Sequence, residues 1–186
     1  MARIAPCAIG IVVLAVAAIW TAGAAPSQDK YALKVPGGLA FADFKGYESW
    51  QVISVSQNGG RFAVILGNPA MIAAYQGGIP GNGAAFPDGA RIAKIHWIPK
   101  KADTEPGQPL VPDTLHDVDF MVKDSHRYAD SGGWGYAQFE YDPAAESFRP
   151  GTLTDSPPQA NDARCGAACH TAARARNYVF TVYGNR

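Results

Sequence analysis

The chain has 186 residues, of which 17% are charged, and its 16 acidic and 16 basic side chains balance to a net charge near zero. A neutral chain without a basic run offers little attraction to nucleic acids or to anionic membrane surfaces, so we expect neither as a partner. The length is enough for one domain with a hydrophobic core.

The first 24 residues have the pattern of a signal peptide. Arg3 gives the positive start, residues 8–19 form an apolar run, and Ala22-Gly23-Ala24 are the small residues of a cleavage site. The apolar run is shorter than the ~20 residues that a membrane-spanning helix needs, so a retained anchor is the weaker alternative. We therefore expect residues 25–186 to form one exported domain, periplasmic or secreted.

The mature chain begins with a hairpin and a helix. Residues 47–56 and 61–66 are rich in β-forming side chains, and Asn58-Gly59-Gly60 between them predicts a tight turn. Asn68-Pro69 predicts the start of a short helix that ends near Gln76.

Further strands are predicted toward the C-terminus. Their patterns fall at residues 91–98, 115–122, 134–141 and, as a last short extended piece, 177–183. Residues 99–112 are expected to form a polar loop and residues 143–159 an irregular segment. These elements indicate an α+β fold, a mainly antiparallel β-sheet with a few helices.

One predicted strand carries a lysine among apolar residues. Side chains alternate along residues 91–98, so Lys94 shares a face with Ile92 and His96. Lysine is seldom buried unless it is paired, which favours a functional group here. The alternative is a lysine that reaches solvent at the margin of the sheet.

The strongest motif lies near the C-terminus, where Cys165 and Cys169 are followed directly by His170. The signature of covalently attached c-type haem is two cysteines separated by two residues and followed directly by a histidine. Here three residues separate the two cysteines. Each thiol would bind one vinyl group, and His170 would be the metal ligand, on the iron. A disulfide would close a very small loop, and zinc would require a further ligand.

The neighbours of the motif predict a haem-binding helix at about residues 163–175. Alanines dominate this segment, and alanine is both small and the best helix former. Arg164, Arg174 and Arg176 could pair with haem propionates. For Arg174 and Arg176, a favourable interaction with the C-terminal end of the helix is the alternative.

Several blocks of the sequence together resemble the cytochrome P-460 family, which includes the c-prime-beta cytochromes. The blocks are residues 47–50 (YESW), 86–94 (FPDGARIAK), 122–128 (VKDSHRY), 133–136 (GWGY) and 165–181, with the haem motif and YVFT. The resemblance implies a β-rich homodimer in which His170 is the proximal ligand of a five-coordinate iron.

The resemblance also points to two further site residues. Lys94 stands where P-460 members carry a lysine that is joined to a haem meso carbon, a link that the c-prime-beta branch lacks. Asp119 stands where hydroxylamine-oxidising members are expected to carry a glutamate. An aspartate is one methylene shorter, and it could act as a catalytic general base. The alternative is a solvated strand carboxylate.

Three functions are therefore carried forward. The first is an exported haem oxidoreductase that oxidises hydroxylamine or handles nitric oxide. The second is a gas-binding cytochrome with an apolar distal cap, for which Phe62, Phe86 and Phe120 are candidates, although each could equally be plain core. The third is an electron-transfer protein, in which Met71 or Met121 would be the sixth ligand.

Overall fold

The computed structural model describes residues 28–153 and 166–184. The signal peptide predicted at residues 1–24 and the site residue Cys165 lie outside the described residues. Among the described residues, no helix has the length and apolar character to cross a membrane.

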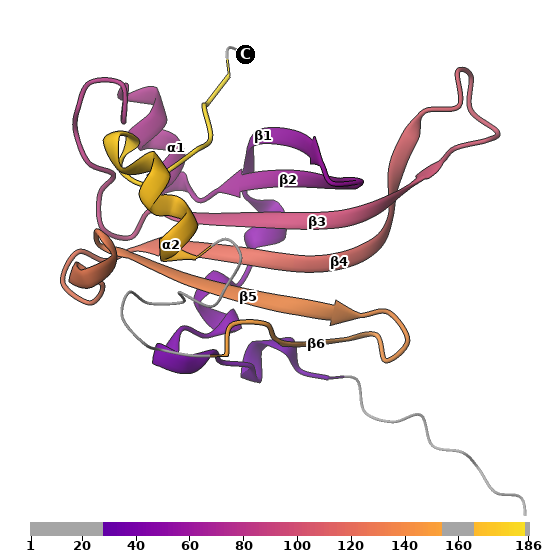
Figure 1. The fold of residues 1–186 in the computed structure, drawn as a ribbon, viewed down its shortest axis with the longest axis horizontal. Coiled ribbons are helices and arrows are strands. Elements are labelled where there is room, and N and C mark those ends of the chain that lie inside the picture. Colours follow the sequence, from indigo (N-terminus) through magenta and orange to yellow (C-terminus); the bar gives the residue numbers. More distant parts are fainter. Residues whose placement is uncertain (1–27, 154–165, 185–186) are drawn as a thin grey trace, which may run out of the picture.

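A six-stranded antiparallel sheet dominates the described part of the chain, and each strand pairs with the next one in sequence (Figure 1). The strands are β1 (Gln51–Asn58), β2 (Arg61–Gly67), β3 (Arg91–Lys101), β4 (Leu110–Lys123), β5 (Trp134–Asp142) and β6 (Ser147–Pro150). Few helices accompany the sheet, so the predicted α+β class is confirmed.

The hairpin between β1 and β2 forms where the sequence predicts it. Asn58 pairs with Arg61, and the two glycines between them have φ angles of 57° and 75°. L-residues with side chains rarely adopt such angles, and a two-residue hairpin turn needs them at both positions. Gly59 and Gly60 therefore fix the register of the first two strands.

Helix α1 (Pro69–Gln76) also matches its prediction. Asn68 caps it, since its Oδ1 accepts a hydrogen bond from the backbone N–H of Met71 at 3.0 Å. The same oxygen accepts from the N–H of Arg91 at 2.9 Å, which ties the start of the helix to the start of β3.

Four predictions for local structure are wrong. Residues 47–49 form a 3-10 turn, because the preceding Gly46 has a φ of 83° and turns the chain before β1. Residues 99–112 are strand at both ends, since the pairing of β3 with β4 continues outward to Lys101 and Leu110, and only residues 102–109 form the loop. The segment predicted as irregular contains β6, which pairs with β5. Residues 177–183 belong to none of the described strands, because Asn177 and Tyr178 have positive φ angles.

The two faces of the sheet carry separate apolar clusters. On one face, Ala93, Ile95, Val118, Phe120 and Phe139 pack against the N-terminal segment with Phe41, Phe44 and Tyr47. On the other face, the alternate residues Ile92, Met121 and Tyr136 pack with α1, with Ala167 and with Val179. This second face also carries helix α2 (Ala167–His170) and its 3-10 continuation Thr171–Arg176 (Figure 1).

Candidate functional site

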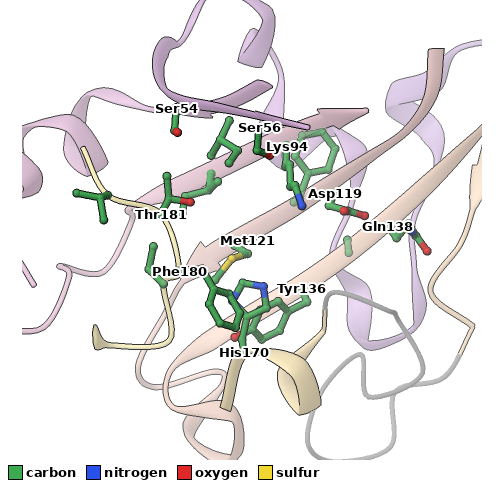
Figure 2. A pocket seen from close by; sticks show the side chains of 16 residues that line it. Ser54, Ser56, Lys94, Asp119, Met121, Tyr136, Gln138, His170, Phe180 and Thr181 are labelled. Atoms are coloured by element: carbon green, nitrogen blue, oxygen red, sulfur yellow. The ribbon is translucent and has the colours of Figure 1, made fainter. Parts of the chain in front are cut away.

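A cavity of about 490 Å³ lies on the second face of the sheet, between the strands and the C-terminal segment (Figure 2). Its size is within the range of ligand and cofactor pockets. Its charged or titratable lining groups include Lys94 from β3, Asp119 from β4 and His170 from α2. Neutral polar lining comes from Ser54, Ser56, Gln138 and Thr181. Apolar lining comes from Ile65, Ile92, Met121, Val179 and Phe180.

His170 is held in one orientation by the segment that follows it. Its Nδ1 lies 2.7 Å from the carbonyl oxygen of Tyr178. A carbonyl can only accept, so Nδ1 carries the proton and Nε2 keeps its lone pair. The rings of Tyr136 and Phe180 flank the imidazole, each at 5.1 Å between centroids. This is the arrangement of a metal-ligating histidine with its second nitrogen fixed by a backbone carbonyl.

The protonation state of His170 suits the same role. Burial lowers its pKa, the hydrogen bond to Tyr178 opposes that shift, and the charge of Lys94 adds to it. The net direction is downward, so the imidazole is neutral at pH 7 and can donate its lone pair to a metal. An apolar cavity with one oriented imidazole nitrogen fits a flat haem held at its iron.

The helix predicted at about residues 163–175 is described only in part, because residues 163–165 lie outside the described residues. Helix α2 begins at Ala167, directly after Gly166, whose backbone is extended. It continues as a 3-10 helix to Arg176, and Asn177, whose φ is 52°, caps it. Cys169 is exposed and directly precedes His170. The spacing between the two thiols involves Cys165, which is outside the described residues.

Lys94 and Asp119 face each other across two neighbouring strands. They are register partners of β3 and β4, and both line the cavity (Figure 2). Asp119 is buried and Lys94 is half-buried. Sequence alternation placed Lys94 on this face, and the pairing of the strands brings Asp119 beside it.

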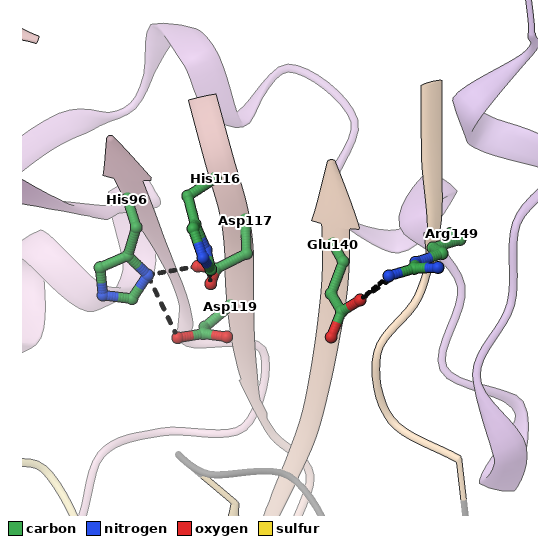
Figure 3. A network of polar contacts seen from close by, with 6 residues as sticks. All are labelled: His96, His116, Asp117, Asp119, Glu140 and Arg149. Atoms are coloured by element: carbon green, nitrogen blue, oxygen red, sulfur yellow. Dashed lines mark hydrogen bonds and ion pairs between the residues drawn. The ribbon is translucent and has the colours of Figure 1, made fainter. Parts of the chain in front are cut away.

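A polar cluster adjoins the cavity and was not foreseen as a unit. His96 Nδ1 contacts Asp117 Oδ1 and lies 3.6 Å from Asp119 Oδ2, and His116 Nδ1 lies 2.6 Å from Asp117 Oδ2 (Figure 3). The cluster lines a second hollow, also of about 490 Å³, which shares Lys94 and Asp119 with the first. The alternation of residues 91–98 and 115–122 predicts which side chains share a face of each strand. Only the register between the two strands shows that these side chains meet.

Electrostatics keep Asp117 ionised despite its burial. Burial would raise its pKa, but the hydrogen bonds and charges of His96 and His116 together outweigh that effect. The net direction is a pKa below the usual range for an aspartate, so this carboxylate is a charged acceptor at neutral pH.

The other sequence candidates fall in different places. Met121 lines the cavity, whereas Met71 is fully buried in the apolar cluster under α1. Phe86 packs in that same cluster, and the ring of Phe120 packs in the cluster on the opposite face. Phe180 is the phenylalanine side chain that stands beside His170, and sequence reasoning missed it.

The candidate propionate partners are only partly placed. Arg174 is exposed, and Arg176 donates a hydrogen bond to the carbonyl of Thr181 at 3.2 Å. Neither of these arginines lines the cavity, and Arg164 is outside the described residues.

Comparison with known proteins identifies a family for this chain. The family model for cytochrome P460 matches residues 44–181, which include both neighbouring strands of the cavity and the motif histidine. No curated protein sequence matches the chain.

Proposed function

The chain belongs to the cytochrome P460 family, and from that premise we propose an exported c-type haem protein whose five-coordinate iron acts on hydroxylamine or nitric oxide. Family membership supports a haem protein that acts on nitrogen compounds. The specific reaction, covalent attachment through Cys165 and Cys169, and export to the periplasm are our proposal.

The observation that carries the proposal is the orientation of His170. Its Nδ1–H is donated to the carbonyl of Tyr178, so the nitrogen that remains for a metal is Nε2, beside an apolar cavity. A histidine of this kind serves as the proximal ligand in many haem proteins. A bound haem would supply a redox-active iron with an open position for a small nitrogen ligand.

The chain's own residues then have distinct tasks. His170 would bind the iron, and the rings of Tyr136 and Phe180 restrict the rotation of its imidazole. Lys94 reaches the same cavity, where its amine would be available for the additional bond to the macrocycle. That bond would replace one N–H and one meso C–H bond, so its formation would require a two-electron oxidant such as a peroxide. Oxidation of hydroxylamine releases protons, and we assign Asp119, which lines the cavity, as the carboxylate that would accept them.

A gas-binding function is the second candidate, and the lining of the cavity favours it. Aliphatic and aromatic side chains supply most of the lining, which suits an uncharged diatomic ligand. In that case Asp119 would have no role in turnover. An electron carrier would instead use Met121, which lines the cavity, as a sixth ligand.

The first test is spectroscopic and uses the exported, matured protein. The pyridine haemochrome spectrum should show covalently attached haem, and the ferrous Soret band should be shifted far to the red. Lys94→Ala should abolish that shift, while Lys101→Ala, an exposed lysine at the outer end of the same strand, should leave it unchanged. Identical spectra for Lys94→Ala and the unaltered protein would refute the link.

The second test separates the enzyme from the gas-binding protein. With an artificial oxidant and without oxygen, the enzyme should consume hydroxylamine, and Asp119→Ala should slow this turnover by about 10²-fold or more with full haem content. Asp103→Ala removes an exposed carboxylate and serves as the control. Tight nitric oxide binding without turnover would favour the second candidate.

A further inference from the structure

A mixed cluster of nitrogen and oxygen donors lies beside the cavity, on the same face of the sheet. It consists of His96 from β3 and of His116, Asp117 and Asp119 from β4 (Figure 3). One ligand atom from each of His96, Asp117 and Asp119 falls within 4.8 Å of the others. Both donor strands belong to the centre of the sheet, so the positions are held by a rigid scaffold.

A β-bulge brings the second histidine into this cluster. His96 pairs with Asp117, but the next residue of β3, Trp97, pairs with Leu115, so His116 is an extra residue in β4. Without the bulge, His116 and Asp117 would point to opposite faces of the sheet. With it, His116 Nδ1 reaches Asp117 Oδ2 at 2.6 Å. Bulges that re-aim a side chain are enriched next to functional sites.

The cluster is shielded but reachable. The side chains of Asp117 and Asp119 are 5% and 10% exposed, and that of His116 is 32% exposed toward the second hollow. The other charged groups that line this hollow are Lys94, Arg61 and Glu140. Glu140 is already bound by Arg149, at 2.7 Å, and so is not counted among the donors.

The donor set selects a class of ion. Mg²⁺ and Ca²⁺ prefer all-oxygen sites, whereas imidazole together with carboxylate suits divalent ions of the zinc type. Zinc takes four ligands in a tetrahedral arrangement, with the nitrogen and oxygen atoms about 2.0–2.2 Å from the metal. We propose that His96, Asp117 and Asp119 form a binding site for a zinc-type divalent cation, with water in the fourth position. His116 then supports the site from outside, through its contact with Asp117.

This site is distinct from the haem position, because His170 and the motif cysteines take no part in it. It shares Asp119 with the cavity, so an ion bound there would hold the carboxylate that borders both hollows. The inference does not depend on which nitrogen compound the protein binds, or on whether it binds one.

Zinc titration of the haem-loaded protein tests the proposal. After removal of loosely bound ions with a chelator, calorimetry and metal analysis should find one zinc ion per chain. His96→Ala should weaken binding by about tenfold or more, since even the loss of an outer partner of a ligand costs about 10–100-fold. His126→Ala removes an exposed histidine outside the cluster and should bind zinc like the unaltered protein. Millimolar Mg²⁺ should not compete.

Equal zinc affinity in His96→Ala and in the unaltered protein would overturn the site, as would the absence of stoichiometric binding. Asp117→Asn keeps the shape of the side chain and provides a second variant with the same expected loss if His96→Ala does not fold. The haem spectrum, recorded on the same samples, reports the proposed function separately. A zinc result of either sign therefore leaves the haem assignment to its own test.

Discussion

The two faces of the sheet are made by the same strands but have opposite characters. Toward the N-terminal segment, aromatic rings surround Phe41, with those of Phe139 and Phe148 at 4.8 and 5.1 Å between centroids. Toward α2, the same strands present a lysine, two histidines and two aspartates around hollows. Buried polar groups lower stability unless they are well paired. The comparison teaches that one face is packed with apolar side chains around Phe41, whereas the other combines an apolar cluster with polar groups that could carry chemistry.

The largest effect on stability is expected on the aromatic face. Phe41→Ala removes a fully buried ring that contacts several others, which costs about 3–5 kcal/mol of the free energy of unfolding. Urea denaturation measures this loss. A loss as small as that of an exposed substitution would mean that the aromatic cluster around Phe41 contributes little to the free energy of unfolding.

Gly132 lies against Tyr178, so a substitution there is expected to change both the free energy of unfolding and the orientation of His170. In Gly132→Ala, the new Cβ would lie 2.2 Å from the ring of Tyr178, at a φ of 69°. The strained backbone costs about 1–3 kcal/mol, and the displaced Tyr178 would move the carbonyl that orients His170. Both stability and the haem spectrum should therefore change. Gly83→Ala has a similar φ of 79° with open space around its Cβ, so it should alter stability alone.

A smaller effect is expected within the polar cluster. Asp117→Asn removes a charge that accepts from two histidines, at about 1–3 kcal/mol for a charged hydrogen-bonded group. Because the pKa of Asp117 is lowered by folding, its contribution is present above the unfolded pKa of about 3.9 and is lost as the pH falls through the folded value. The free energy of unfolding of both proteins should be measured at pH 7 and at pH 3, with a chelator present to exclude bound metal ions. The difference in this free energy between Asp117→Asn and the unaltered protein should be smaller at pH 3.

The smallest effect on stability is expected for Lys94→Ala. Its side chain is half-buried at the edge of a hollow, so the free energy of unfolding should change by about 1 kcal/mol or less. The same variant is expected to abolish the ferrous Soret shift. A large loss of stability with an unaltered spectrum would show that Lys94 stabilises the fold and does not contact the haem.

Local patterns predicted the elements better than their connections. The turn at Gly59-Gly60, the cap at Asn68 and the alternation around Lys94 depend on neighbouring residues, and the structure confirms them. The bulge at His116 and the pairing of β6 depend on the register of distant strands, so no local signal predicted them. The roles of Lys94 and Asp119 came from family resemblance. The structure places the two side by side, and their chemistry stays a prediction.

The hydrogen bond from His170 to Tyr178 depends on contacts that span half the chain. Asn177, directly before Tyr178, accepts from the backbone N–H of Phe86 with its side chain and from the indole of Trp134 with its carbonyl. A short synthetic peptide with only the cysteines and the histidine would hold a porphyrin with a freely turning imidazole. If the proposed haem is bound, the properties that imidazole orientation controls, such as ligand on-rates and reduction potential, therefore depend on the folded domain and not only on the predicted attachment motif.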